Sequence, residues 1–148
     1  MNAVPHLAAR SLVDQLELDN LLKELVGRAS VNEVLVIGGG GKKQIGEFSD
    51  SMSLLKTGLL QKNGITKVGV AGHPEGSTDI SDERLKTALL EKNEFAKTEG
   101  LNMYIETQFC FDSEIVLNWE KCIRAYGNEL PIHIGICLLY TSPSPRDS

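Results

Sequence analysis

Residues 67–76 read KVGVAGHPEG, a short apolar strand that runs directly into a loop of glycine, proline and ionisable residues. Val68 and Val70 alternate with small residues, so neither face of this strand is polar. Strands that are apolar on both faces are typical of parallel sheets covered by helices. The stretch therefore predicts a buried parallel strand whose carboxyl end opens onto a loop that a ligand can approach.

Similar runs recur along the chain, at residues 33–39, 103–109 and 131–136, and residues 3–7 resemble the end of an earlier strand. Between them, apolar residues at helical spacing predict helices over residues 11–29, 49–61, 81–98 and 113–126. Ser81 is a candidate N-cap, and Gly100 and Gly127 are candidate stops. The strands repeat at roughly 30 residues, the length of a βαβ unit. The fold class is therefore α/β, with about five strands and four helices.

Two architectures are compatible with this pattern, a doubly wound open sheet and a (β/α)8 barrel, and periodicity alone does not separate them. Both place ligands beyond the carboxyl ends of the strands. The residues at those ends can therefore be compared before the architecture is chosen.

Every expected strand ends in polar or glycine-rich residues: His6, glycines 38–41, the segment 72–76, Thr107 with Gln108, and Gly135. Glycines there would let a flat ligand lie against the backbone. The loop 38–43 matches neither the P-loop nor the dinucleotide-binding pattern, and a plain surface turn is the alternative. His73 and Glu75 suit proton transfer or ligand hydrogen bonds, with a solvated His-Pro turn as the alternative.

Other polar residues have simpler interpretations. His133 alternates with isoleucines and is expected to be buried in the sheet, while Cys110 and Cys122 are expected to act as small apolar residues. Glu106 shares the face of Gln108 and would need a partner if it were buried. No nucleophile elbow and no metal-ligand spacing of His, Asp or Glu is present in the sequence.

Composition narrows the class of protein. The formal charge of −5 provides no basic stripe for nucleic acid, and no apolar run approaches the length of a membrane helix. Three cysteines fit neither a paired disulfide framework nor a close-spaced zinc site. A reduced, cytoplasmic setting is expected.

The last twelve residues, CLLYTSPSPRDS at 137–148, have no periodicity and offer little to a core. Residues 137–147 resemble a translated sequencing-library adapter, and a genuine disordered tail is the alternative. We interpret residues 137–148 as a disordered, non-native tail and residues 1–136 as the structured part.

In order along residues 3–136, PHLAAR (5–10), VIGGG (36–40), FSDSMSLLK (48–56), VAGHPEG (70–76) and TQFCFD (107–112) resemble motifs of the methylenetetrahydrofolate reductase family. The resemblance implies a (β/α)8 barrel, here partial, with FAD at the carboxyl ends of the strands. It implies an oxidoreductase of one-carbon metabolism and methionine biosynthesis. NAD(P)H reduces the flavin, which then reduces 5,10-methylenetetrahydrofolate to 5-methyltetrahydrofolate.

Carried over by position, the resemblance implies FAD contacts at six residues: His6, Gly38, Gly39, Ala71, His73 and Lys92. Lys92 is similar to a basic residue near the FAD phosphates, and His73 stands where many members have an aromatic residue. Gln108 is similar to the glutamine that contacts the folate substrate and, in its turn, the nicotinamide. No metal is implied.

The chain also departs from the family pattern. Gly40 stands where many members have an aspartate near flavin and folate, and the general acid of the family belongs to a strand before this chain. The segment is therefore expected to be a fragment, inactive by itself, with about five of eight strands. A folate- or nucleotide-binding α/β module without redox activity is the alternative. The sequence leaves open the choice of NADH or NADPH and the oligomeric state, a homo-oligomer included.

Overall fold

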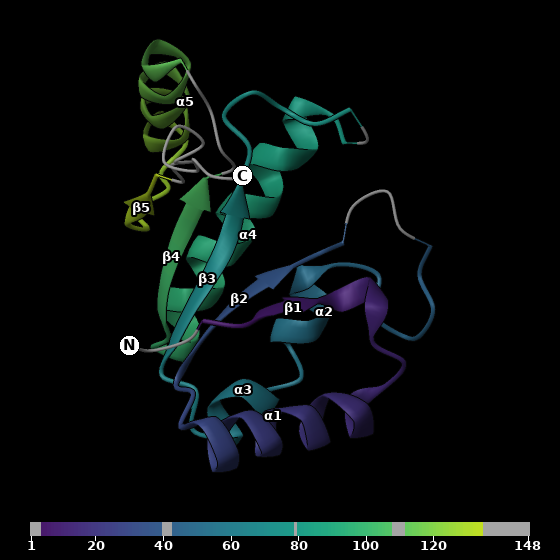
Figure 1. The fold of residues 1–148 in the computed structure, drawn as a ribbon. Coiled ribbons are helices and arrows are strands. Elements are labelled where there is room, and N and C mark those ends of the chain that lie inside the picture. Colours follow the sequence, from purple (N-terminus) through teal and green to yellow (C-terminus); the bar gives the residue numbers. More distant parts are fainter. Residues whose placement is uncertain (1–3, 40–42, 79, 108–111, 135–148) are drawn as a thin grey trace, which may run out of the picture.

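The computed structural model describes residues 4–39, 43–78, 80–107 and 112–134. These residues form one sheet whose strands are β1 (His6–Ala8), β2 (Glu33–Ile37), β3 (Lys67–Gly72), β4 (Asn102–Thr107) and β5 (Ile132–His133). The connecting helices are η1 (Ala9–Ser11), α1 (Gln15–Ala29), α2 (Ser51–Leu55), α3 (Leu59–Lys62), α4 (Asp82–Glu99) and α5 (Ser113–Ala125). Figure 1 shows the sheet at the centre of this arrangement. The predicted α/β class is confirmed.

All the pairings between neighbouring strands are parallel, and the spatial order β1-β2-β3-β4-β5 follows the chain order. A doubly wound sheet reverses its strand order at one point, and the described strands contain no such reversal. Because the strands are parallel, their carboxyl ends share one edge of the sheet.

One face of the sheet carries the apolar core. The register sets Val34 beside Val68 and Val68 beside Met103. A second row, two residues further along each strand, contains Val36, Val70 and Ile105. These side chains are buried with residues from the helices, among them Leu18, Leu22, Leu54, Leu55, Leu60, Leu89, Ala96 and Ile123. The helices therefore pack on this face of the sheet.

Local capping explains where the helices begin and end. The side chain of Ser81 accepts a hydrogen bond from the backbone N–H of Arg84, and Gly100 ends α4 in the left-handed conformation, as predicted. The single helix predicted over residues 49–61 is wrong. Gly58, with φ of +73°, separates α2 from α3, because that conformation interrupts the helical backbone.

The opposite face of the sheet is organised around Tyr104. Its ring lies across Gly69, and a Cβ added to that glycine would stand 2.6 Å from the Tyr104 Cζ atom and 2.7 Å from Leu35 Cδ1. The Tyr104 hydroxyl donates a 2.7 Å hydrogen bond to Glu33 on β2. Burial, and then this hydrogen bond, raises the pKa of Tyr104. The ring therefore ties β4 to β2 across β3.

The expectation that His133 is buried is wrong. Its side chain is exposed and stacks on Tyr104, with ring centroids 4.2 Å apart. Alternation with isoleucines predicted burial, but in the described part of the chain β5 is an edge strand that pairs with β4 alone. Glu106, which pairs with His133 in the register, is only half-buried. It therefore does not need the partner that a fully buried carboxylate would require.

We predict that Gly69→Ala lowers the free energy of unfolding by about 1–3 kcal/mol, because the new methyl group would collide with the Tyr104 ring. Gly27→Ala in α1 is the matched control. No heavy atom lies within 4 Å of its added Cβ, so alanine should stabilise the helix by about 0.5–1 kcal/mol. Urea unfolding followed by circular dichroism measures both changes, and equal stability of Gly69→Ala and wild type would contradict the packing described for Tyr104.

Candidate functional site

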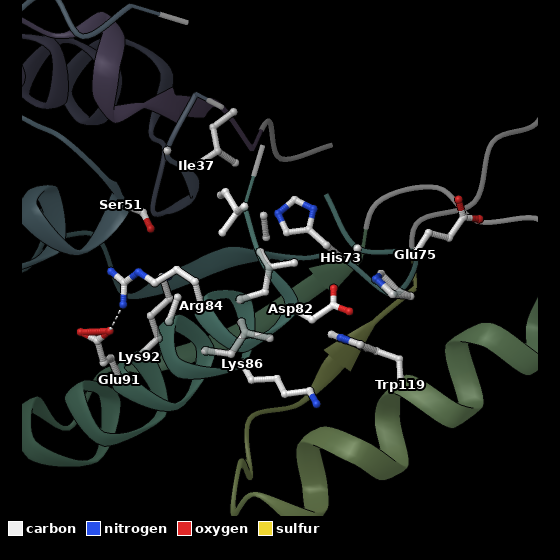
Figure 2. Close-up of a pocket in the computed structure, with 18 of the residues that line it drawn as sticks. Ile37, Ser51, His73, Glu75, Asp82, Arg84, Lys86, Glu91, Lys92 and Trp119 are labelled. Atoms are coloured by element: carbon white, nitrogen blue, oxygen red, sulfur yellow. Dashed lines mark hydrogen bonds and ion pairs between the residues drawn. The ribbon is translucent and has the colours of Figure 1, made fainter. Parts of the chain in front are cut away.

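A cavity of about 540 Å³ lies at the carboxyl ends of β2 and β3. Its walls come from those strand ends, the start of α2, the amino-terminal half of α4 and one face of α5. Figure 2 shows side chains from these separate elements converging on it. Parallel strands make this edge the expected place for a ligand.

The strand ends leave room for a ligand because they carry small residues. A Cβ built on Gly38 would meet no heavy atom within 4 Å among the described residues, so the end of β2 borders open space. At the end of β3, a Cβ on Gly72 would stand 2.9 Å from the Trp119 ring and 2.6 Å from Ile105. Glycine at position 72 thus lets the indole pack over the strand end.

His73 follows β3 and lines the cavity. Its backbone carbonyl accepts a 3.0 Å hydrogen bond from the Gly76 N–H, which closes the turn. Its Nδ1 atom is buried and has no hydrogen-bond partner within the described ranges. Depending on the tautomer, this nitrogen can accept or donate a hydrogen bond, so a ligand group could satisfy it.

Lys92 places a positive charge in the cavity wall. Its side chain comes from α4 and is only 6% exposed. In the described part of the chain, no carboxylate lies within 4.0 Å of its ammonium group. Burial lowers the pKa of Lys92, and attraction to Asp50 and Glu91 opposes this shift in part. A buried and unpaired ammonium group favours an anionic ligand.

Arg84 engages Asp50 and Glu91, the two carboxylates whose attraction opposes the lowering of the pKa of Lys92. Its guanidinium lies 3.0 Å from Glu91 and 3.9 Å from Asp50, and Figure 2 shows the contact with Glu91. Asp50 also caps α2 by accepting a 2.9 Å hydrogen bond from the Ser53 N–H. These carboxylates therefore do not compensate the charge of Lys92 at ion-pair distance.

The far end of the cavity is aromatic. Trp119, on α5, lines it together with Cys122, and Lys86 enters from α4. The Lys86 ammonium lies 4.9 Å from the centre of the Tyr126 ring. Attraction to Cys122 is the largest cause of a raised pKa of Lys86, and attraction to Tyr126 is the next. The same cavity is thus lined by both cationic and aromatic side chains.

The structure brings together four of the six residues predicted to contact FAD. Gly38, Ala71, His73 and Lys92 all line the cavity. Gly39 and His6 do not line it. Gly39 has φ of +86° and lies over Ala8 and Arg10, and His6 is exposed on β1. The predicted substrate residue Gln108, together with Gly40 and Cys110, lies outside the described residues.

Sequence reasoning missed the roles of Arg84 and Lys86 in the cavity wall. Cys122 is half-buried and lines the cavity, and its treatment as a small apolar residue stays a prediction. The burial of Lys92 could have been predicted from the sequence, because it continues the apolar series of Leu85, Ala88 and Leu89 along one face of α4.

No protein-family model matches the chain. Within the described residues, no group of three or more His, Cys, Asp or Glu side chains could hold a metal ion. None of the helices in the described part combines the length and apolarity that a membrane crossing needs. The site is therefore interpreted from its own geometry.

We predict that Lys92→Met stabilises the ligand-free chain by about 1 kcal/mol or more, because it removes a buried and unpaired charge. The folded-state pKa of Lys92 lies below the ordinary lysine value of 10.5, so the unfolded chain binds the proton more tightly. The cost of Lys92 is therefore fully present below the folded-state pKa and disappears above about pH 10.5.

Urea unfolding of wild type and Lys92→Met at a series of pH values measures this difference. The gap should be largest near neutral pH and close as the pH rises. Lys121→Met, at an exposed position on α5, is the control and should change stability by less than about 0.5 kcal/mol. A gap that is absent, or that widens with pH, would show that Lys92 is not an unpaired buried cation.

Proposed function

We propose that the chain is a segment of an FAD-dependent methylenetetrahydrofolate reductase and that the cavity at β2 and β3 receives part of the FAD. The observation that supports this most is the convergence of Gly38, Ala71, His73 and Lys92. The family resemblance named these residues as FAD contacts from three separate sequence segments, and all four line one cavity.

The strand order supports a partial (β/α)8 barrel. Connections between parallel strands are right-handed, so a sheet whose order never reverses keeps its helices on one face and turns the other face inward. In a barrel, that inner face is filled by layers of side chains. Leu35, Gly69 and Tyr104 share one register row on that face and would form part of such a layer.

The chemistry of the cavity suits a dinucleotide. A bound FAD supplies hydride transfer from NAD(P)H to 5,10-methylenetetrahydrofolate. Lys92 would neutralise a phosphate, since its ammonium is buried without a partner at ion-pair distance in the described residues. The Nδ1 atom of His73, which has no partner in the described residues, would donate or accept a hydrogen bond with the ligand. Gly38 would allow a ring to approach the backbone.

The role of Lys92 can be tested on the 148-residue chain by the quenching of flavin fluorescence. We predict that FAD binds more tightly than riboflavin, which has no phosphates, and that Lys92→Met weakens FAD binding by roughly tenfold or more while leaving riboflavin binding nearly unchanged. Lys121→Met removes a positive charge outside the cavity and should affect neither ligand. Equal affinities for FAD and riboflavin would contradict a phosphate site at Lys92.

The redox part of the proposal is tested on the intact protein, because the resemblance implies a general acid on an earlier strand. The intact protein should purify with flavin absorbance, lose it on addition of NAD(P)H, and recover it on addition of 5,10-methylenetetrahydrofolate.

A colourless intact protein that binds ADP as tightly as FAD would instead identify a nucleotide-binding module. The cavity also supports this second candidate, because a buried cation and an aromatic side chain would suit the phosphate and the base of any nucleotide.

A further inference from the structure

The sequence contains a single Asn-Gly pair, at Asn63 and Gly64. Asn63 caps the carboxyl end of α3, and Gly64 follows it, exposed and with φ of +89°. A glycine after asparagine has no side chain to shield its backbone nitrogen, and its free rotation lets that nitrogen approach the asparagine side chain. Asn63 is therefore the asparagine of this chain that is most open to attack by its own backbone.

The side-chain amide of Asn63 also joins α3 to α1. Its Nδ2 atom donates a 2.9 Å hydrogen bond to Asp19 Oδ1 on α1 and a second one, also 2.9 Å, to the Leu59 carbonyl. The bond from Asn63 is the largest cause of a lowered pKa of Asp19, ahead of a hydrogen bond from Lys23. Asp19 therefore accepts this bond as a carboxylate, and the two side chains fasten elements that are 44 residues apart in the sequence.

The folded backbone keeps the same groups from reacting. The Gly64 N–H donates a 3.1 Å hydrogen bond to the Gln61 carbonyl, and this bond must break before the Gly64 nitrogen can reach Cγ of Asn63. α3 is only four residues long and lies between Gly58 and Gly64, which both have positive φ. Short surface segments flanked by glycine open locally at a lower free energy than core strands. Reaction at Asn63 is therefore expected only when α3 opens.

We propose that Asn63 is a deamidation site whose reaction is controlled by Asp19 and whose product separates α3 from α1. The Gly64 nitrogen loses its proton to solvent and attacks Cγ of Asn63. A nitrogen–carbon bond forms, the Cγ–Nδ2 bond breaks, and the amide nitrogen leaves as ammonia. Water then opens the resulting succinimide ring and leaves aspartate or isoaspartate. The net change consumes a water molecule, releases ammonia and adds a negative charge, without any oxidant or reductant.

The product cannot make the contact that Asn63 makes. A carboxylate at this position has no N–H to donate, and it would face the carboxylate of Asp19 across the former 2.9 Å contact. Lys23 lies 2.7 Å from Asp19 and would offset only part of that repulsion. Isoaspartate would in addition lengthen the main chain next to the buried Ile65. The site lies before β3, whereas the cavity lies at the carboxyl end of β3, so this inference does not depend on the proposed function.

The rate of the reaction is measured on the folded 148-residue chain at neutral pH, by peptide mass spectrometry in heavy-oxygen water, which labels the product. Asp19→Ala should speed deamidation of Asn63 by roughly threefold or more, because the amide loses an acceptor that holds it in place. Glu24→Ala is the matched control. It removes a carboxylate of α1 that lies beside Arg28, and it should leave the rate unchanged. In urea the wild type and both variants should react at one common, faster rate.

A second measurement follows the effect of the product. Asn63→Asp reproduces its charge and should lower the urea midpoint of unfolding below that of Asn63→Ala, which removes the hydrogen bond without adding a charge. Adding Asp19→Asn to Asn63→Asp exchanges the donor and the acceptor, and it should return the midpoint most of the way to the wild-type value.

The proposal is overturned if the folded wild type and Asp19→Ala both remain unmodified while the chain in urea reacts, or if Asp19→Ala and Glu24→Ala react at the same rate. A urea midpoint of Asn63→Asp equal to that of the wild type would refute the separation of α3 from α1. Failure of the chain to bind FAD would refute the proposed function alone, because these rates and midpoints do not involve the cavity.

Discussion

The parallel pairing of consecutive strands is the constraint on which the other features depend. Because each strand pairs in parallel with the next one in the chain, every connection must return along the sheet, and the helices cover one face. The same pairing brings the carboxyl ends of β2 and β3 side by side. The cavity lies where β2 is followed by Gly38 and where the small Ala71 lies near the end of β3.

The position of α4 converts this opening into a charged site. Leu89 and Ala96 hold the helix against the sheet, and Lys92 lies between them on the same face. Lys92 is therefore buried because its neighbours on this face pack against the sheet, and not because it forms an ion pair. The free energy of that packing thus maintains a cation in a place where water solvates it poorly.

Sequence reasoning was most successful where structure is decided locally. Ser81 and Gly100 marked the ends of α4 because capping depends on a few adjacent residues. The strands were found from their apolar runs, and the position of His73 at a strand end already made it a candidate. Lys92 was named only through the family resemblance. The break at Gly58 was missed because an apolar period continued through it. The exposure of His133 and the position of Lys86 over the Tyr126 ring depend on which elements pack together, and periodicity within one element does not contain that information.

The arrangement of charge around the cavity shows why an anionic occupant is the natural complement of this site. Lys86 and Lys92 lie on one helix and line one space, and Arg84 already engages Glu91 and Asp50. An occupant with negative groups would offset the desolvation of Lys92. The features that make the ligand-free cavity unfavourable are therefore the same features that would make it selective for phosphates or carboxylates.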